Sequence, residues 1–217
     1  MTTDQSAQLE RMTKLHELSS EATWNYWFSY SHAGTWQFWV EIALLVVPLL
    51  ALFLYIDRGK AFLLGFYGFC VHMLFTYIDA YGVTHGLWIY PYKAIPFLSV
   101  NLPLDTALIP VLYMFMYQWT INFGKNYYIY GTALCLFLSF LFKPAMVAFD
   151  LFRFNHGTGY LHLLAGYLTI LCLSRWVTNL FLYAERTSKQ DPPDGGPVLR
   201  QPRAYKLLRQ FSRPKAR

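Results

Sequence analysis

The strongest constraint on this chain is a set of five long apolar stretches. A bilayer core about 30 Å thick takes roughly 20 mostly apolar residues to cross as a helix, and each stretch has that length. A soluble protein with an unusually apolar core is the alternative, but five runs of this length argue against it. The sequence therefore predicts an all-α fold, an integral membrane bundle of five transmembrane helices. The predicted spans are residues 37–56, 61 to about 81, about 104 to 123, 127 to about 149, and 161–183.

Composition agrees with a membrane protein. Hydrophobic residues make up 55% of the chain and charged residues only 14%, against about 25% charged in typical soluble domains. This excludes a disordered or nucleic-acid-wrapping chain, so we expect no nucleic-acid partner. The three cysteines lie apart within apolar runs, which excludes a disulfide scaffold or a zinc ribbon. Aromatic residues cluster at the ends of the stretches, as is typical of a membrane interface: Trp36, Trp39, Trp88, Tyr90, Trp119, Tyr127, Tyr128 and Trp176.

Three regions follow from this pattern: an N-terminal amphipathic or interfacial segment (1–36), a transmembrane domain (37–184) and a basic tail (185–217). The first segment opens with Thr2, Thr3 and Asp4 and lacks the pattern of a signal peptide. An apolar residue recurs in it at every third position from 9 to 18, which predicts a short amphipathic helix. That helix would suit either a membrane interface or a protein partner.

The distribution of basic residues predicts the orientation in the membrane. Nine of the 18 Lys and Arg residues follow Ala184. With five spans, twelve basic residues lie on the side of the C-terminus and five on the other side. The positive-inside rule then places the N-terminus outside and the C-terminus in the cytoplasm. We therefore expect a multi-pass protein of the plasma membrane. The tail is either a contact with anionic lipids, at about 1 kcal/mol per cation near the surface, or an unstructured solubilising segment.

Ionisable residues inside the predicted spans form the candidate site. They are costly to insert and usually face the bundle interior or a cavity. The predicted orientation brings most of them toward the outer leaflet, and the spacing of seven places His72 and Asp79 on one helix face. They are either a ligand-binding set or structural ion pairs. The candidate residues are Glu41, His72, Asp79, Asp105, Lys143, Asp150 and His162.

The segment 82–103 joins the second and third spans. Its prolines exclude a continuous helix, and its aromatic residues make it too apolar for open water. We expect it to fold over the outer end of the bundle, either as a lid on a cavity or as a loop anchored in the interface.

A series of residues between Asp57 and Gln118 resembles a family of small, uncharacterised multi-pass membrane proteins of spore-forming Bacillus-like and Clostridium-like bacteria. The likeness extends over roughly residues 41–183 and implies a five-helix membrane protein without an activity that transfers. In the fourth span the family tends to have an acid before proline, where this chain has Lys143 and Pro144. The residues that carry the resemblance are Asp57, Arg58, Asp79, Trp88, Ile89, Tyr90, Pro91, Pro96, Pro103, Leu104, Asp105, Pro110, Tyr117 and Gln118.

Three functions fit these observations. The first is an outer polar cavity that binds a lipid, a small amphiphile or an ion. The second is a membrane-embedded enzyme of the isomerase or cyclase type, acting on an isoprenoid or another lipid with Asp79 or Asp105 as proton donor. The third is an accessory subunit or homo-oligomer that docks through the N-terminal helix or the tail. The sequence contains none of the GxSxG, HExxH, P-loop or GxGxxG signatures, so we expect no cofactor and no metal.

Overall fold

The protein is built almost entirely of helices. The structure, a computed structural model, describes residues 1–155 and 157–190. Four of its helical stretches are long and apolar enough to cross a membrane: Trp36–Tyr55, Arg58–Thr84, Tyr127–Ala148 and Tyr160–Thr187. The predicted all-helical class is therefore confirmed, and four of the five predicted spans match these apolar stretches.

The longest connection between helices is the segment 85–102, which joins α3 to η3 and contains β1. Two two-residue strands, β1 (Trp88–Ile89) and β2 (Arg153–Phe154), pair in antiparallel fashion between the connecting loops. The helices are α1 (Thr3–Tyr26) with its π-helical continuation η1 (Trp27–Ser31), α2 (Trp36–Tyr55), the 3₁₀ turn η2 (Arg58–Lys60), α3 (Ala61–Thr84), the π-helical η3 (Pro103–Leu108) with α4 (Ile109–Asn122), α5 (Tyr127–Phe137), the π-helical η4 (Leu138–Phe142), α6 (Lys143–Ala148) and α7 (Tyr160–Gln190).

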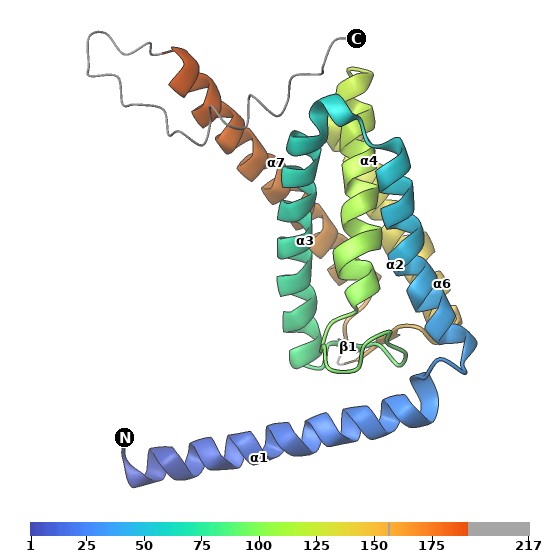
Figure 1. Ribbon diagram of the computed structural model, residues 1–217, viewed down its shortest axis with the longest axis vertical. Helices are drawn as coiled ribbons and strands as arrows, with labels where there is room; N and C mark the ends of the chain where they lie inside the picture. Colours follow the sequence, from blue (N-terminus) through green and yellow to red (C-terminus); the bar gives the residue numbers. More distant parts are fainter. Residues whose placement is uncertain (156, 191–217) are drawn as a thin grey trace, which may run out of the picture. The chain divides into compact units, whose positions relative to one another are not determined.

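The third predicted span, about 104 to 123, is helical but does not belong to the four apolar stretches. It corresponds to η3 and α4, which contact α2, α3 and α5 and lie among the other helices (Figure 1). Seven residues of α4 are buried. A helix enclosed by other helices meets little lipid, so it tolerates more polar residues than a lipid-facing helix does.

Prolines mark two irregular places in the helices. Pro110 and Pro144 each follow a π-helical segment, η3 and η4, and each lies at the start of the next α-helix. Pro48, in contrast, lies within α2. Proline removes a backbone donor, and a π-helical turn is a usual place for a helix to change its course.

The chain divides after Leu180 into two units, the first of which, residues 1–180, is compact. The first unit contains α1 and the bundle. Of the second unit, the structure describes only the last turns of α7. The predicted lipid contact of the basic tail lies outside the described residues.

A cluster of buried tyrosines fills the middle of the bundle. The hydroxyls of Tyr67 and Tyr127 lie 2.7 Å apart, and that of Tyr127 also donates to the carbonyl of Leu171 at 2.9 Å. Arg175 donates to the hydroxyl of Tyr117, and its guanidinium lies 4.8 Å from the centre of that ring. The charge of Arg175 is therefore held by aromatic rings within the protein.

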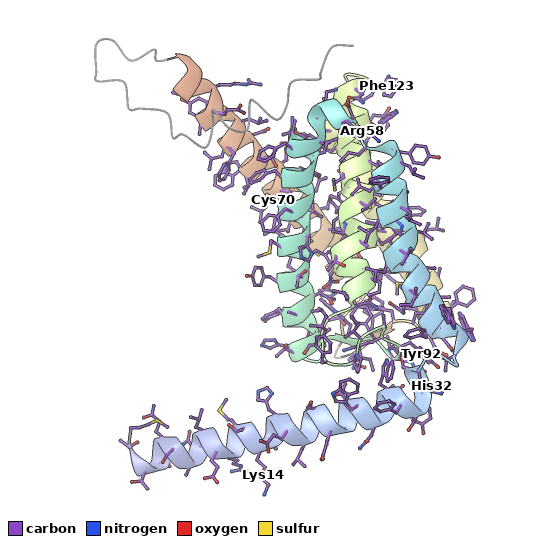
Figure 2. All side chains as sticks on the ribbon, viewed as in Figure 1. Lys14, His32, Arg58, Cys70, Tyr92 and Phe123 are labelled. Atoms are coloured by element: carbon purple, nitrogen blue, oxygen red, sulfur yellow. The ribbon has the colours of Figure 1, made fainter. Side chains whose placement is uncertain are left out.

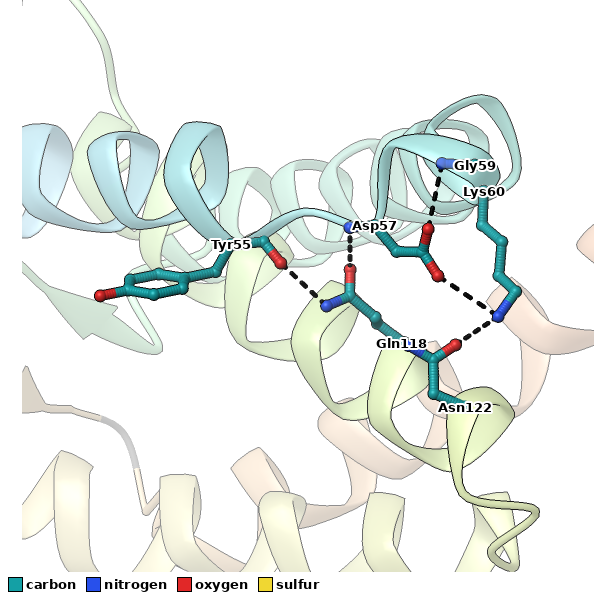
Figure 3. Close-up of polar contacts among 6 residues, drawn as sticks. All are labelled: Tyr55, Asp57, Gly59, Lys60, Gln118 and Asn122. Carbon is teal, nitrogen blue, oxygen red and sulfur yellow. Dashed lines mark hydrogen bonds and ion pairs between the residues drawn. The ribbon is translucent and has the colours of Figure 1, made fainter.

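Hydrogen bonds and an ion pair join the turn between α2 and α3 to the C-terminal end of α4 (Figure 3). The side chain of Gln118 accepts from the backbone N–H of Asp57 at 2.8 Å and donates to the carbonyl of Tyr55 at 3.0 Å. Lys60 lies 3.3 Å from the carboxylate of Asp57 and also donates to Asn122. The hydrogen bond from Lys60 holds the pKa of Asp57 below its usual value. In Figure 2, Arg58 and Phe123 mark this end of the bundle, and Tyr92 marks the opposite end.

Candidate functional site

The loop between α3 and α4 folds back over the end of the bundle and meets Asp79. The indole N–H of Trp88 and the hydroxyl of Tyr90 both donate to Oδ1 of Asp79, at 2.8 and 2.7 Å. The backbone N–H of Asn101 lies 3.4 Å from Oδ2. Asp79 is buried, and each of its oxygens accepts at least one hydrogen bond. Three donors from one loop on one carboxylate are typical of an ionised acceptor.

Asn101 ties the same loop to α2. Its side-chain N–H donates to Oε2 of Glu41 at 3.0 Å, and its side-chain oxygen accepts from the backbone N–H of Leu104 at 3.1 Å. The other oxygen of Glu41, Oε1, is buried without a hydrogen-bond partner. Glu41 and Asn101 are fully buried, so the loop is attached to the bundle through groups that water does not reach.

Asp105 is the least satisfied group of the site. It lies in the first turn of η3 and is fully buried, and neither of its carboxyl oxygens has a hydrogen-bond partner. Its electrostatic neighbours are Asp79 and Lys143. An ionised carboxylate in this position would have a like charge nearby and no donor of its own, which is unfavourable in an apolar surrounding.

Lys143 supplies the positive charge of the site without a close ion pair. It is 1% exposed, and its ammonium donates to the hydroxyl of Tyr90 at 3.4 Å. The ammonium lies 3.9 Å from the centre of the Phe152 ring. Within the described chain, the salt bridges shorter than 4.0 Å are Lys60–Asp57 and Arg153–Asp150. Lys143 therefore acts on Asp79 and Asp105 through the field of its charge and not by direct contact.

The remaining candidates lie around this centre or away from it. The ring nitrogen Nδ1 of His72 lies 2.8 Å from the backbone carbonyl of Asp105, so His72 binds the backbone of the site and not Asp79. Asp150 is exposed and binds Arg153 at 2.9 Å. His162 is exposed at the start of α7, where its Nδ1 accepts from the N–H of Gly159 at 3.2 Å.

The structure thus brings together Glu41, Asp79, Asp105 and Lys143, here called the carboxyl cluster. Sequence reasoning missed Asn101, which joins two of its members. Asn101 carries no charge, and its only signal in the sequence is that it is an asparagine in an otherwise mostly apolar loop.

A small cavity borders the carboxyl cluster between α3 and α7. Its volume is about 30 Å³, and its polar lining comes from Asp79, Tyr90, Lys143, His162 and Tyr167. The buried hydroxyl of Tyr167 has no hydrogen-bond partner. A water molecule needs roughly 10–15 Å³ of such space, so one or two water molecules fit, whereas drug-sized ligands need about 300–1,000 Å³.

Among the described residues, no group of three or more His, Cys, Asp or Glu side chains is arranged to hold a metal ion.

Comparison with protein-family models, curated proteins and solved structures found no match to this chain. The resemblance to the family of small multi-pass proteins therefore stays a prediction. What the findings support is that four helical stretches of the described chain are apolar enough to span a membrane, as in a membrane protein.

Proposed function

We propose that the bundle crosses the membrane five times, with η3 and α4 as the third crossing. The support is the position of α4 among the other helices and its burial, which removes the need for an apolar surface on every side. Each of its neighbours in sequence, α3 and α5, belongs to an apolar spanning stretch. The chain between them must then return across the bilayer once.

Five crossings place the two termini on opposite sides. We propose that the N-terminus lies outside and the C-terminus in the cytoplasm of the plasma membrane, because Arg58, Lys60 and Lys125 lie at the ends of spans on the side of the basic tail. Alkaline phosphatase and fluorescent protein fused to the C-terminus test this. Phosphatase activity together with loss of fluorescence would reverse the orientation.

We propose that the protein binds protons at the carboxyl cluster and responds to them. Three carboxyls and one ammonium would carry a net charge of −2 in an apolar bundle if all were ionised. The observation that carries the proposal is the distribution of hydrogen bonds. Asp79 has partners for both oxygens, whereas Glu41 and Asp105 have buried oxygens without any.

The simplest neutral state follows from this difference. Asp79 stays ionised and is balanced by Lys143, and Glu41 and Asp105 each carry a proton. Removing an unpartnered charge from an apolar site avoids a large desolvation cost. The adjacent cavity has room for one or two water molecules, which could bring protons to the site or take them away. An isoprenoid or lipid substrate would need far more room beside Asp79 or Asp105, so the geometry supports a proton in preference to the lipid, amphiphile or enzyme alternatives.

Stability as a function of pH tests the proposal. The folded bundle binds two protons that the unfolded chain releases at neutral pH, so its free energy of unfolding falls as pH rises, by about 2.7 kcal/mol per pH unit. Asp105→Asn should lower this slope by about half, and combined with Glu41→Gln it should leave almost no slope. Denaturant unfolding of the purified protein in mild detergent measures it.

The matched control is Asp150→Asn, which removes an exposed carboxylate and should leave the slope unchanged. A flat profile in the unmodified protein would refute proton binding at this site. A profile that depends on the concentration of sodium or potassium instead of pH would assign the site to a metal cation and equally refute it.

A further inference from the structure

Helix α1 has apolar side chains that nothing in the described protein covers. No residue of α1 is buried. Leu9, Met12 and Leu15 are 53%, 57% and 59% exposed. Three large apolar residues on one side of a helix usually face a partner surface, so the question is which surface they face.

The second half of α1 lies against the end of the bundle. Ser19, Thr23 and Tyr26 line a groove of about 340 Å³ whose other wall includes Pro91 and Lys93 of the loop. A second groove, of about 450 Å³, lies next to it and is also lined by Ser19, Thr23 and Lys93. This half of the helix therefore has a known side toward the bundle.

Hydrogen bonds fix the helix to that loop. The indole N–H of Trp27 and the hydroxyl of Ser31 both donate to the carbonyl of Lys93, at 2.9 and 3.2 Å. The backbone N–H of Lys93 donates to the hydroxyl of Ser31 at 3.0 Å. The ammonium of Lys93 in turn donates to the carbonyls of Leu98 and Ser99, at 3.1 and 2.7 Å. The direction of α1 is thus set by a loop that is itself held in place.

The side of α1 that faces the bundle in its second half can be followed into its first half by helical periodicity. Residues seven apart lie on nearly the same side of a helix, and Met12 precedes Ser19 by seven. Leu15 precedes Ala22 by seven, and Ala22 also lines the first groove.

The opposite side of α1 carries charges, among them Lys14, which points away from the bundle in Figure 2. The charged residues of this side are Glu10, Lys14, Glu17 and Glu21.

The first half of α1 continues past the grooves. Residues 3–15 extend roughly 20 Å at about 1.5 Å per residue, and α1 runs across the end of the spanning helices and not along them (Figure 1). Beside the end of a bundle that spans a membrane lies the headgroup surface of the adjacent lipid leaflet. The aromatic residues at the junction of α1 and α2 are exposed at the same end, as is typical of an interface: Trp24, Phe28, Tyr30, Trp36 and Trp39.

We propose that α1 is an interfacial helix that lies in the plane of the membrane, with Leu9, Met12 and Leu15 in the headgroup region and its charged side in water. The charges of the water-facing side are mostly acidic, so attraction to anionic lipid plays no part and phosphatidylcholine suffices. This inference does not rest on proton binding by the carboxyl cluster.

Fluorescent labels on α1 test the proposal in the full chain. In a Cys172→Ser background, which removes the exposed cysteine, Met12→Cys and Leu15→Cys are labelled with an environment-sensitive dye in phosphatidylcholine nanodiscs. We expect blue-shifted emission, quenching by spin-labelled lipid and several-fold weaker quenching by iodide than at the control positions. Those controls are Glu10→Cys and Glu17→Cys, on the charged side of the same helix.

Two results would overturn the inference. Equal iodide quenching at all four positions would show that α1 is away from the bilayer. Protection of positions 12 and 15 without quenching by spin-labelled lipid, in a protein that forms dimers as its concentration rises, would assign the apolar side to a second copy of the chain.

Discussion

Replacing Lys143 with methionine should destabilise the bundle by about 3–5 kcal/mol, the usual cost of removing one partner of a buried charge pair. Methionine keeps most of the length and the apolar stem of lysine, so packing against the Phe152 ring is largely retained. The loss is the positive charge that balances Asp79, which would remain buried and ionised. Denaturant unfolding in mild detergent, followed by tryptophan fluorescence, measures the change.

A second substitution separates charge from packing in this experiment. Asp79→Asn combined with Lys143→Met leaves no charge on either residue, so the double variant should recover part of the lost stability. The control Lys125→Met removes an exposed lysine and should have almost no effect. Unchanged stability of the Lys143→Met protein would contradict a buried, ionised Asp79.

Replacing Gly82 with alanine should displace Trp88 of the loop from Asp79. A Cβ atom at this position would lie 1.9 Å from Cζ2 of Trp88, a distance that a rigid indole ring next to a helix cannot accommodate without moving. The ring must shift, and its hydrogen bond to Asp79 is lost. Overpacking together with a lost bond to a charged group costs about 2–4 kcal/mol. The midpoint of thermal unfolding measures it.

The same helix provides the control. Gly65 also lies in α3, and a Cβ there would meet nothing within 4 Å. Gly65→Ala should therefore stabilise the helix slightly, by about 0.5–1 kcal/mol, because alanine loses less backbone freedom than glycine on folding. Equal effects of the two alanines would contradict a tight contact between Trp88 and α3.

The apolar pattern predicted the membrane class because spanning helices must present apolar residues to lipid along their whole length. The same logic was weakest for the third predicted span. The helix α4 is surrounded by protein, so its composition is set by its neighbours and not by lipid. Hydropathy alone cannot distinguish an enclosed spanning helix from a shorter helix buried in a protein core.

The candidate site was likewise predictable in part: the sequence placed some of its residues correctly and misplaced others. Depth along the predicted spans placed Glu41, Asp79 and Asp105 near one another, because helix rise converts position in the sequence into height. That arithmetic does not hold beyond a helix end. The helix α6 ends at Ala148, so Asp150 lies in a turn with a φ of 58° and its carboxylate pairs at the surface.

The sequence predicted that the loop folds over the end of the bundle, but not which residues it contacts. Its hydrogen bonds join residues 60 positions apart for Asn101 and Glu41, and 22 apart for Asn101 and Asp79. Local propensity carries no information on such pairs. The contacts of the loop with Glu41 and Asp79 are therefore a finding of the structure, whereas its fold over the bundle and the helices that frame the site were predictable.

Infrared spectroscopy of the carboxyl groups tests the central claim most directly. At neutral pH the protein in detergent should show the carbonyl stretching band of protonated carboxylic acid, which shifts on transfer to heavy water. The band should weaken in Asp105→Asn and in Glu41→Gln, and it should be unchanged in Asp150→Asn, which removes an exposed carboxylate. Absence of the band in the unmodified protein, or equal intensity in all three variants, would contradict proton binding at the carboxyl cluster.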